Sequence, residues 1–215
     1  MNEALGMAMR LRPATADDAA QIAAIYAPYV QGTAISFETE PPDAEEMARR
    51  IAKTQAHWAW LVAEAEPEAE QDGLVLAYAY AGSHAERAAY RWSTSVSVYG
   101  APTACRRGLG RALYTALLGL LRLQGFHSAY AGITQPNEAS VGLHLAMGFQ
   151  LIGTYPAAGH KLGRWNDVSR YWLPLQPRGE GPVCTAPPET RTLAAVLATP
   201  EGTAALAAGQ ALLQA

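Results

Sequence analysis

A loop rich in glycine and arginine runs directly into an apolar helical pattern near the middle of the chain. The stretch CRRGLGRALYTALLGLL, residues 105–121, places Gly108 and Gly110 at the start of that pattern. Glycine is less favourable than alanine inside a helix by about 1 kcal/mol, so its presence here needs a reason. The first turn of a helix has unpaired N–H groups and a partial positive charge, and glycine lets an anion approach the backbone. The stretch therefore predicts a phosphate-binding loop or, alternatively, an ordinary turn from strand to helix.

Two common phosphate motifs do not match this loop. A P-loop continues from its last glycine into Lys and then Ser or Thr, whereas Gly110 is followed by Arg111. A dinucleotide-binding fingerprint needs a third glycine where Leu113 stands, within a βαβ unit near the start of the chain. Both of these classes of nucleotide site are therefore excluded.

Composition and charge exclude further classes of protein. With 16 Lys and Arg against 19 Asp and Glu, the net charge is −3, which provides no broad basic field for a nucleic acid or a membrane surface. Cys105 and Cys184 lie far apart without metal-binding spacing, so we expect no disulfide framework and no metal site. The first ten residues lack the apolar run of a signal peptide, and no stretch is long enough to span a bilayer. We expect a cytoplasmic protein of one domain with a tail, or of at most two small domains.

Hydrophobic periodicity along the chain predicts a mixed α+β domain. Residues 11–30 contain a short strand and then a helix capped by Thr15, and a second helix begins at Asp43. Further strands are expected over residues 59–66, 73–84, 90–100, 127–134, 149–156 and 169–175, with helices over 105–121 and 137–148. The order is β-α-α-β-β-β-α-β-α-β-β. A Pro/Gly-rich linker follows, and then an Ala/Leu-rich tail, which predicts one or two short helices that dock, pair with another chain or stay loose.

The loop and its surroundings resemble a known family. The loop is similar to the pyrophosphate loop of the GCN5-related N-acetyltransferases (GNAT), with the pattern Gln/Arg-x-x-Gly-x-Gly/Ala. The segments YRWSTSVSVYG, PNEASVGLHLAMGF and GHKLGRWNDV resemble the phosphinothricin acetyltransferase branch. The resemblance divides the chain into an N-terminal extension (1–9), an acetyltransferase domain (10–176) and a linker with a C-terminal tail (177–215). It implies a twisted mixed sheet that splays between its fourth and fifth strands, with flanking helices.

The resemblance also implies where acetyl-CoA would bind. Backbone groups on the fourth strand would hold the pantetheine arm, the loop would hold the pyrophosphate, and an asparagine after the fifth strand would lie near the arm. The residues expected at the cofactor are Val98, Tyr99, Gly100, Arg106, Arg107, Gly108, Leu109, Gly110, Arg111 and Asn137. The leading Gln or Arg of the family loop is Cys105 in this chain.

The expected catalytic base departs from the family pattern. Relatives place a carboxylate on the fourth strand, and the matching position is Ser95, which can hold a water but cannot act alone as a base. His144 matches the second catalytic position, although a helix histidine is also commonly packed against a sheet. Glu38 falls in the loop that faces the substrate in the family, or is an exposed loop acid. These three residues are the catalytic candidates.

Aromatic and basic residues provide candidates for the amine pocket. The aromatic candidates are Phe37, Tyr80, Tyr90 and Trp92, which are alternatively core residues of strands. Lys161 would pair with a substrate carboxylate or remain solvated.

Two functions from different classes follow from these patterns. The first is an acetyl-CoA-dependent N-acetyltransferase, in which the primary amine of a small amino-acid-like substrate attacks the thioester directly in a ternary complex. The second is a non-catalytic acyl-CoA-binding homologue that lost its base at Ser95. A third hypothesis is a protein N-terminal acetyltransferase. It is weaker, because the resemblance lies with the branch that acts on small molecules. The resemblance also implies a homodimer.

Overall fold

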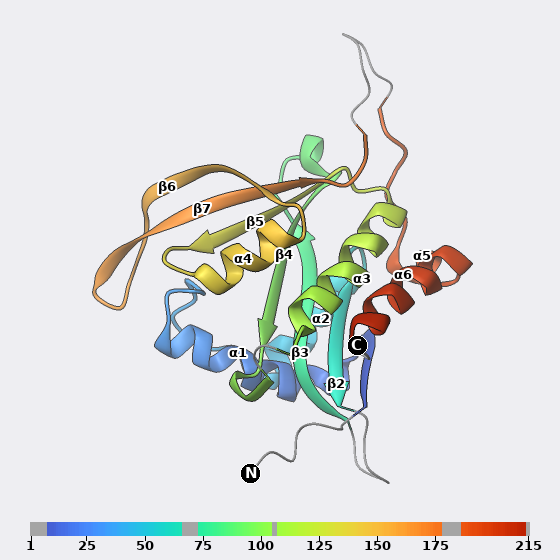
Figure 1. Ribbon diagram of the computed structural model, residues 1–215. Helices are drawn as coiled ribbons and strands as arrows, with labels where there is room; N and C mark the ends of the chain where they lie inside the picture. Colours follow the sequence, from blue (N-terminus) through green and yellow to red (C-terminus); the bar gives the residue numbers. More distant parts are fainter. Residues whose placement is uncertain (1–7, 66–72, 105–106, 178–185, 214–215) are drawn as a thin grey trace.

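One mixed sheet organises the part of the chain that the structure describes. The computed structural model describes residues 8–65, 73–104, 107–177 and 186–213. The strands are β1 (Met9–Pro13), β2 (Trp60–Ala65), β3 (Leu74–Ser83), β4 (Ser93–Gly100), β5 (Ser128–Thr134), β6 (Gln150–Lys161) and β7 (Arg164–Pro174). The helices are α1 (Ala19–Gly32), α2 (Ala44–Gln55), α3 (Leu109–Gln124), α4 (Glu138–Ala146), α5 (Leu193–Leu197) and α6 (Pro200–Gln210). The α+β class and the expected order of elements are confirmed (Figure 1).

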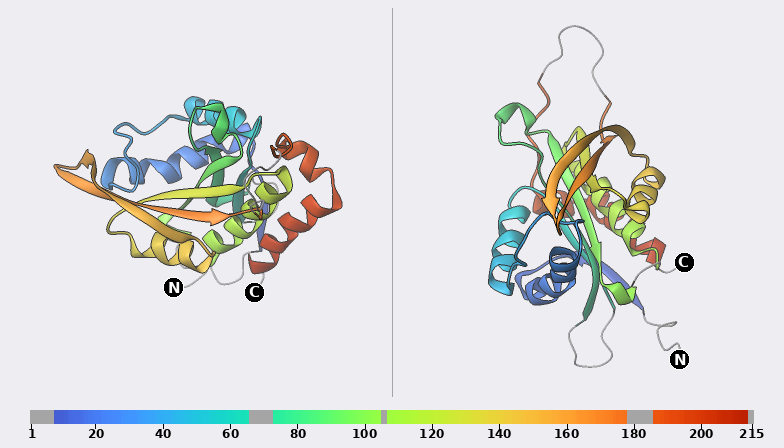
Figure 2. Two further views of the ribbon diagram at one scale, coloured as in Figure 1. Left: turned by 90° about the horizontal axis from the view of Figure 1, so that it is seen from above. Right: turned by 90° about the vertical axis from the view of Figure 1, so that its left-hand side faces the viewer.

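Helices cover both faces of this sheet. Helices α1 and α2 lie on one face, and α3, α4 and the C-terminal helices lie on the other (Figure 2). Helix α3 is the centre of the larger core, because Leu113, Leu117 and Leu121 have no exposed surface. The smaller core joins Ile22 of α1 and Met47 of α2 to the opposite face of the sheet. The apolar pattern behind the glycine loop therefore anchors that loop to the larger core.

The sheet parts in its middle, as the resemblance implied. The strand order is β1-β2-β3-β4-β5-β7-β6, and every neighbouring pair is antiparallel except β4 and β5. The parallel pairing of β4 with β5 ends at Ser95 and Tyr130, although β4 continues to Gly100 and β5 to Thr134. The two strands therefore diverge after Ser95, and backbone groups of β4 beyond it face a gap. The expected splay between the fourth and fifth strands is confirmed.

Helix starts follow the capping signals in the sequence. Thr15 and Asp18 form a capping box at the 3-10 turn that leads into α1. Asp43 caps α2, because its side chain accepts a hydrogen bond of 2.8 Å from the backbone N–H of Glu46. Asp17 and Asp18 lie in the first turn, where negative charge complements the helix dipole.

The hairpin of β6 and β7 is longer than the sequence indicates. Its strands pair from Gln150 with Trp172 to Lys161 with Arg164, so both extend well beyond the expected 149–156 and 169–175. The register shifts between Tyr155 and Gly159, where the strand lacks regular alternation. The hairpin projects away from β2 and β3 and curves over the gap side of the sheet (Figures 1 and 2).

The Ala/Leu-rich tail forms two helices that dock on the domain. Helix α6 packs along α3, where Gly209 lies so close to the carbonyl of Ala112 that a Cβ would stand 2.5 Å from that oxygen. Pro200 begins α6 instead of interrupting it, and Gly202 allows a tight turn against the carbonyl of Val196. Of the three expectations for the tail, docking on the domain is the one that the structure shows.

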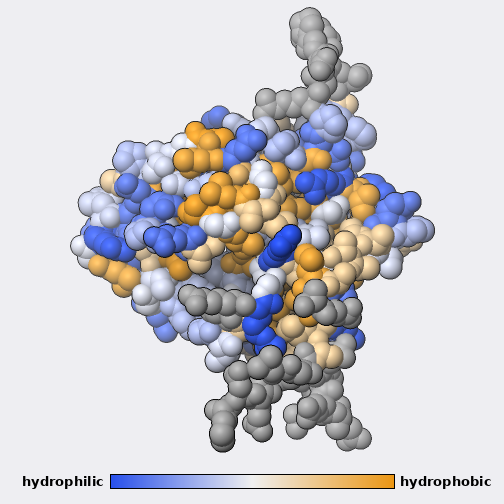
Figure 3. Space-filling model, viewed as in Figure 1, coloured by the Kyte–Doolittle hydropathy of each residue, from blue (hydrophilic) through white to orange (hydrophobic). Residues whose placement is uncertain are grey.

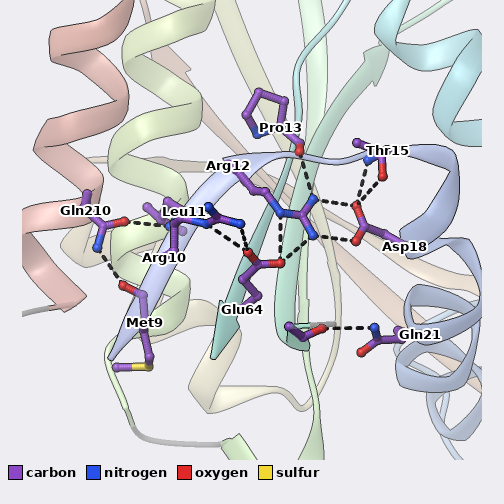
Figure 4. A network of polar contacts seen from close by, with 11 residues as sticks. Met9, Arg10, Leu11, Arg12, Pro13, Thr15, Asp18, Gln21, Glu64 and Gln210 are labelled. Carbon is purple, nitrogen blue, oxygen red and sulfur yellow. Dashed lines mark hydrogen bonds and ion pairs between the residues drawn. The ribbon is translucent and has the colours of Figure 1, made fainter. Parts of the chain in front are cut away.

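A polar network joins β1, β2 and the C-terminal helix (Figure 4). The carboxylate of Glu64, which is 1% exposed, accepts hydrogen bonds from the guanidinium groups of Arg10 and Arg12. Arg12 also bonds both carboxylate oxygens of Asp18, each at 2.7 Å. The side-chain amide of Gln210 bonds the backbone of the outer edge of β1, as a neighbouring strand would.

Candidate active site

The gap between β4 and β5 opens into a larger cavity. A small space of about 50 Å³ lies between the strands and is lined by residues that include Ser97, Gly132 and His144. It adjoins a cavity of about 550 Å³, which extends along the end of β4 to the glycine loop and the start of α4. Val98, Tyr99 and Asn137 line both spaces. The cavity therefore runs from the point where the strands part to the helix N-terminus.

Glycine is needed at the two positions of the loop for different structural reasons. Gly108 has φ +75°, a left-handed conformation that strains other residues, and it forms the N-cap of α3. A Cβ at Gly108 would meet nothing within 4 Å, so the backbone here is open. Gly110 lies against Leu143 of α4, because a Cβ there would stand 3.0 Å from Leu143 Cδ2. The loop is thus an exposed backbone turn fixed to a closely packed pair of helices.

The cavity fits the cofactor that the resemblance implied. Its wall offers strand backbone at one end and, at the other, an open helix N-terminus with two arginines, which suits a long arm ending in an anionic pyrophosphate. The expected cofactor residues that line it are Val98, Tyr99, Gly100, Arg107, Gly108, Leu109, Gly110, Arg111 and Asn137. Asn137 also caps α4, since its Oδ1 accepts from the N–H of Ser140 at 3.1 Å. Arg106 and Cys105 lie outside the described residues.

Ser95 stands at the last paired position before the strands diverge. It pairs with Gly82 of β3 and with Tyr130 of β5, so its hydroxyl lies at the apex of the gap. The nearest titratable group that bonds it is His84, whose Nδ1 is 3.4 Å from Ser95 Oγ. A hydroxyl and an imidazole therefore occupy the place where the resemblance implies a carboxylate.

His144 is buried and uses both ring nitrogens. Its Nδ1 lies 2.7 Å from the carbonyl oxygen of Ser140, which can only accept, so Nδ1 carries the proton. Its Nε2 accepts a hydrogen bond of 3.1 Å from the hydroxyl of Tyr114. Burial lowers the pKa of His144, against a smaller opposite effect of the bond to Ser140. The ring is 3% exposed and lines the gap as a neutral, fixed group.

Glu38 is engaged in an ion pair. Its two oxygens accept from Nη1 and Nη2 of Arg50 at 2.8 and 3.1 Å, and the hydroxyl of Tyr26 donates to the first oxygen at 3.0 Å. The carboxylate therefore ties the loop after α1 to α2. The structure does not bring it into contact with Ser95 or His144.

Lys161 and Phe37 connect the long hairpin to the loop after α1. The ammonium of Lys161, in a residue only 8% exposed, donates to the carbonyls of Val30 and Ser36, both at 2.6 Å. It is therefore not solvated, and two of its three donors bond the backbone. The ring of Phe37 covers Gly159, where a Cβ would meet Phe37 Cε2 at 2.4 Å. These contacts hold the loop and the hairpin together as one wall.

The other expected aromatic residues lie in three different places. Tyr80 stacks on Trp60 with ring centroids 4.4 Å apart and lines a separate space of about 300 Å³ between α2 and the sheet. Tyr90 is 44% exposed and meets His84 edge to face. Trp92 donates its indole N–H to the carbonyl of Pro188 at 2.8 Å, so it holds the segment that leads to α5. The structure therefore does not gather these side chains into one pocket.

The strand register brings to the gap further residues that the sequence patterns did not indicate. Arg170 of β7 pairs with Gly132 of β5, and a Cβ at Gly132 would stand 2.8 Å from Arg170 Nη1. The guanidinium lies 5.7 Å from the ring centre of Tyr155, and no described carboxylate pairs with it. Ser97 shares the face of Ser95 by strand alternation, a signal present in the sequence. His84 and Arg170 had no local signal.

A sheet that parts beside a glycine loop at a helix N-terminus is the arrangement that the resemblance implied for an acyltransferase that uses a coenzyme A thioester. The family model for the acetyltransferase (GNAT) domain matches residues 11–169, and the chain belongs to this family. The expected acetyltransferase class and acetyl-CoA as its cofactor are confirmed.

Similar proteins include enzymes that act on amino-acid analogues. A phosphinothricin N-acetyltransferase from Streptomyces viridochromogenes is 41% identical over 180 residues, covering 81% of this chain and 94% of the relative. An L-methionine sulfoximine/L-methionine sulfone acetyltransferase from Pseudomonas paraeruginosa is 34% identical over 177 residues, covering 82% and 100%. A solved phosphinothricin acetyltransferase from Sinorhizobium meliloti, in complex with AcCoA, has a TM-score of 0.73 at 36% identity, covering 85% of this chain and 95% of that chain. These likenesses confirm the phosphinothricin acetyltransferase-like branch.

Proposed function

We propose that this enzyme moves an acetyl group from acetyl-CoA to the primary amine of a small amino-acid-like substrate. The single observation that carries the proposal is the cavity that runs from the glycine loop along the end of β4 and adjoins the space between the parted strands β4 and β5. When bound, the cofactor supplies an activated acetyl thioester. The chain's own residues hold the cofactor along the β4 backbone and leave the apex open to an amine. The amine attacks directly in a ternary complex, after losing a proton.

Arg170 supports an anionic, amino-acid-like substrate. Its guanidinium lies over Gly132 at the gap, and none of the described carboxylates neutralises it. A guanidinium is a strong partner for a carboxylate, which would hold the substrate with its amine toward Ser95. Relatives named for phosphinothricin and for methionine sulfoximine fit this substrate class. We expect Arg170→Gln to raise KM for the amine while leaving KM for acetyl-CoA unchanged.

The test is a thiol-release assay with acetyl-CoA and a panel of amino-acid analogues. It compares the wild type with Ser95→Glu, which restores the carboxylate, and with Ser93→Glu, which places one on the same face of β4 two residues earlier. Turnover by the wild type supports the proposal and identifies the substrate. A wild type that binds acetyl-CoA without turnover, together with an active Ser95→Glu, supports the non-catalytic homologue instead. Failure to bind acetyl-CoA by calorimetry would contradict both.

We also propose a cytoplasmic homodimer. Strand β6 ends the sheet, and Leu145, Leu151 and Ile152 near it are each more than half exposed. Figure 3 shows hydrophobic residues gathered where α4 and β6 reach the surface. An uncovered apolar edge favours association, and a second copy of the chain is its proposed partner. Sedimentation should give twice the chain mass, with Ile152→Lys as the disrupting variant and Leu74→Lys, equally exposed on β3, as its control.

A cytoplasmic location fits a chain with only two cysteines. Among the helices of the described residues, none combines the length and the apolar content needed to cross a bilayer.

A further inference from the structure

The imidazole of His84 reaches the position of the absent carboxylate from another segment of the chain. His84 follows the end of β3, eleven residues before Ser95, and its Nδ1 lies 3.4 Å from Ser95 Oγ. Ser95 pairs with Tyr130 at the last bonded position before the gap, so this contact lies at the apex where the acyl group would be attacked. A hydroxyl alone is a poor proton acceptor, whereas an imidazole is a good one near neutral pH.

The ring of His84 is held in place without blocking its second nitrogen. It stacks on Tyr130 with centroids 4.1 Å apart and an interplanar angle of 22°, and Tyr90 meets it edge to face at 5.8 Å. No hydrogen bond to Nε2 exists among the described residues, and the side chain is half-buried. One nitrogen therefore faces Ser95 while the other can exchange a proton with solvent. This differs from His144, whose two nitrogens are both occupied.

We propose that His84, acting through the Ser95 hydroxyl, accepts the proton that the substrate ammonium must lose. The inference rests on the proposed function. One N–H bond of the ammonium breaks and its proton passes to Ser95 Oγ, while the hydroxyl proton of Ser95 passes to His84 Nδ1. Ser95 is unchanged by the exchange, the amine becomes a neutral nucleophile, and His84 becomes an imidazolium. His84 then loses the proton on Nε2 to solvent, and exchange with water that protonates Nε2 and removes the proton from Nδ1 returns the ring to its starting tautomer.

The charges around His84 favour its neutral form before the transfer. The groups that face it are Ser95 from β4, Tyr130 from β5, Tyr90 from the turn before β4 and the guanidinium of Arg170 from β7. Burial and then the charge of Arg170 lower the pKa of His84 below its ordinary value of 6.5. The imidazole is therefore unprotonated at neutral pH, and the nearby cation favours rapid release of the proton it accepts.

The test measures kcat against pH for the full chain with acetyl-CoA and the best amine of the panel. We expect His84→Gln and His84→Ala to lower kcat about 10²- to 10⁴-fold, the range for loss of a general base, with KM for acetyl-CoA unchanged. The rise of kcat with pH through a pKa below 6.5 should disappear in both variants. Adding Ser95→Glu to His84→Ala should restore turnover, because the carboxylate then accepts the proton itself. His57→Gln, at an exposed histidine, is the matched control.

The outcomes separate this inference from the proposed function. If the wild type acetylates the amine and the His84 variants keep both its kcat and the rise of kcat with pH, the inference is overturned. The acetyltransferase activity then still stands. If the wild type binds acetyl-CoA but turns over no amine, both are overturned. Loss of activity in His84→Ala with no recovery on adding Ser95→Glu, while Ser95→Glu alone is active, would show a structural role for the ring and would also overturn the inference.

Discussion

Removing the carboxylate of Glu64 should destabilise the protein strongly, because two guanidinium groups depend on it. Glu64 is 1% exposed and accepts from Arg10 and Arg12. Removing one partner of a buried ion pair costs about 3–5 kcal/mol in the free energy of unfolding. In Glu64→Gln, Arg12 keeps its bonds to Asp18, and the side chain of Arg10 is already 56% exposed. We therefore expect a loss in the free energy of unfolding at the lower end of this range, about 3 kcal/mol. For a chain of this length that corresponds to a fall in Tm of about 6–12 °C.

The same network sets how stability depends on pH. Burial alone would raise the pKa of Glu64, but hydrogen bonds from Arg12 and Arg10 outweigh it and hold that pKa below 4.5. A carboxyl whose pKa is lower in the folded state stabilises the protein above its unfolded pKa, and that stabilisation is lost as pH falls through the folded value. The Tm of the wild type should therefore fall as pH drops below about 5, and the Tm of Glu64→Gln should fall less steeply.

Thermal unfolding at several pH values, followed by circular dichroism, measures both effects. The control is Glu46→Gln, which also removes an arginine-paired carboxylate but from a helix surface where the Glu46 side chain is 32% exposed, and its Tm should stay close to that of the wild type. A Glu64→Gln variant as stable as the wild type at pH 7, or with the same slope below pH 5, would refute the reasoning.

Two further predictions concern the glycine loop and the edge of the sheet. Gly108→Ala imposes about 1–2 kcal/mol of left-handed strain, so the loop should shift and the Kd for acetyl-CoA, measured by calorimetry, should rise about 5- to 30-fold. Gly142→Ala, where a Cβ meets nothing within 4 Å, should leave Kd unchanged; equal values for both variants would contradict the prediction. Gln210→Ala removes the bond to the N–H of Leu11, so hydrogen exchange at that amide should accelerate selectively. Unchanged exchange would show that the bond does not protect the strand.

The order of elements could be predicted because its signals are local. Thr15 and Asp43 cap helices within three residues of themselves, and the glycine loop and its apolar helix are contiguous. The length of the last hairpin could not be predicted, because residues 156–161 contain proline, alanine and glycine without alternation. Long-range contacts fix that segment instead: Lys161 bonds carbonyls 125 and 131 residues away, and Phe37 covers Gly159.

The lining of the large cavity could be predicted from the sequence and the apex of the gap could not, for the same reason. The described residues that line the large cavity belong mostly to one strand, one loop and one helix start, which a family pattern captures residue by residue. The apex of the gap is formed by His84, Ser95, Tyr130 and Arg170, which four different segments supply. Sequence spacing carries no information about such a meeting, because strand register alone decides it.

The two hydrogen bonds between the side chain of Gln210 and β1 have a consequence for synthesis of the chain. The carbonyl of Met9 receives its hydrogen bond from a residue 201 positions later in the chain. At about 5–20 residues per second, ribosomes need about 10–40 s to make that interval. Strand β7 ends at Pro174, so while residues 175–210 are made the outer edge of β1 is exposed beside an otherwise complete sheet, in an uncovered state that invites pairing with other nascent chains. The side-chain amide of Gln210 therefore determines both how and when the outer edge of β1 is protected during synthesis of the chain.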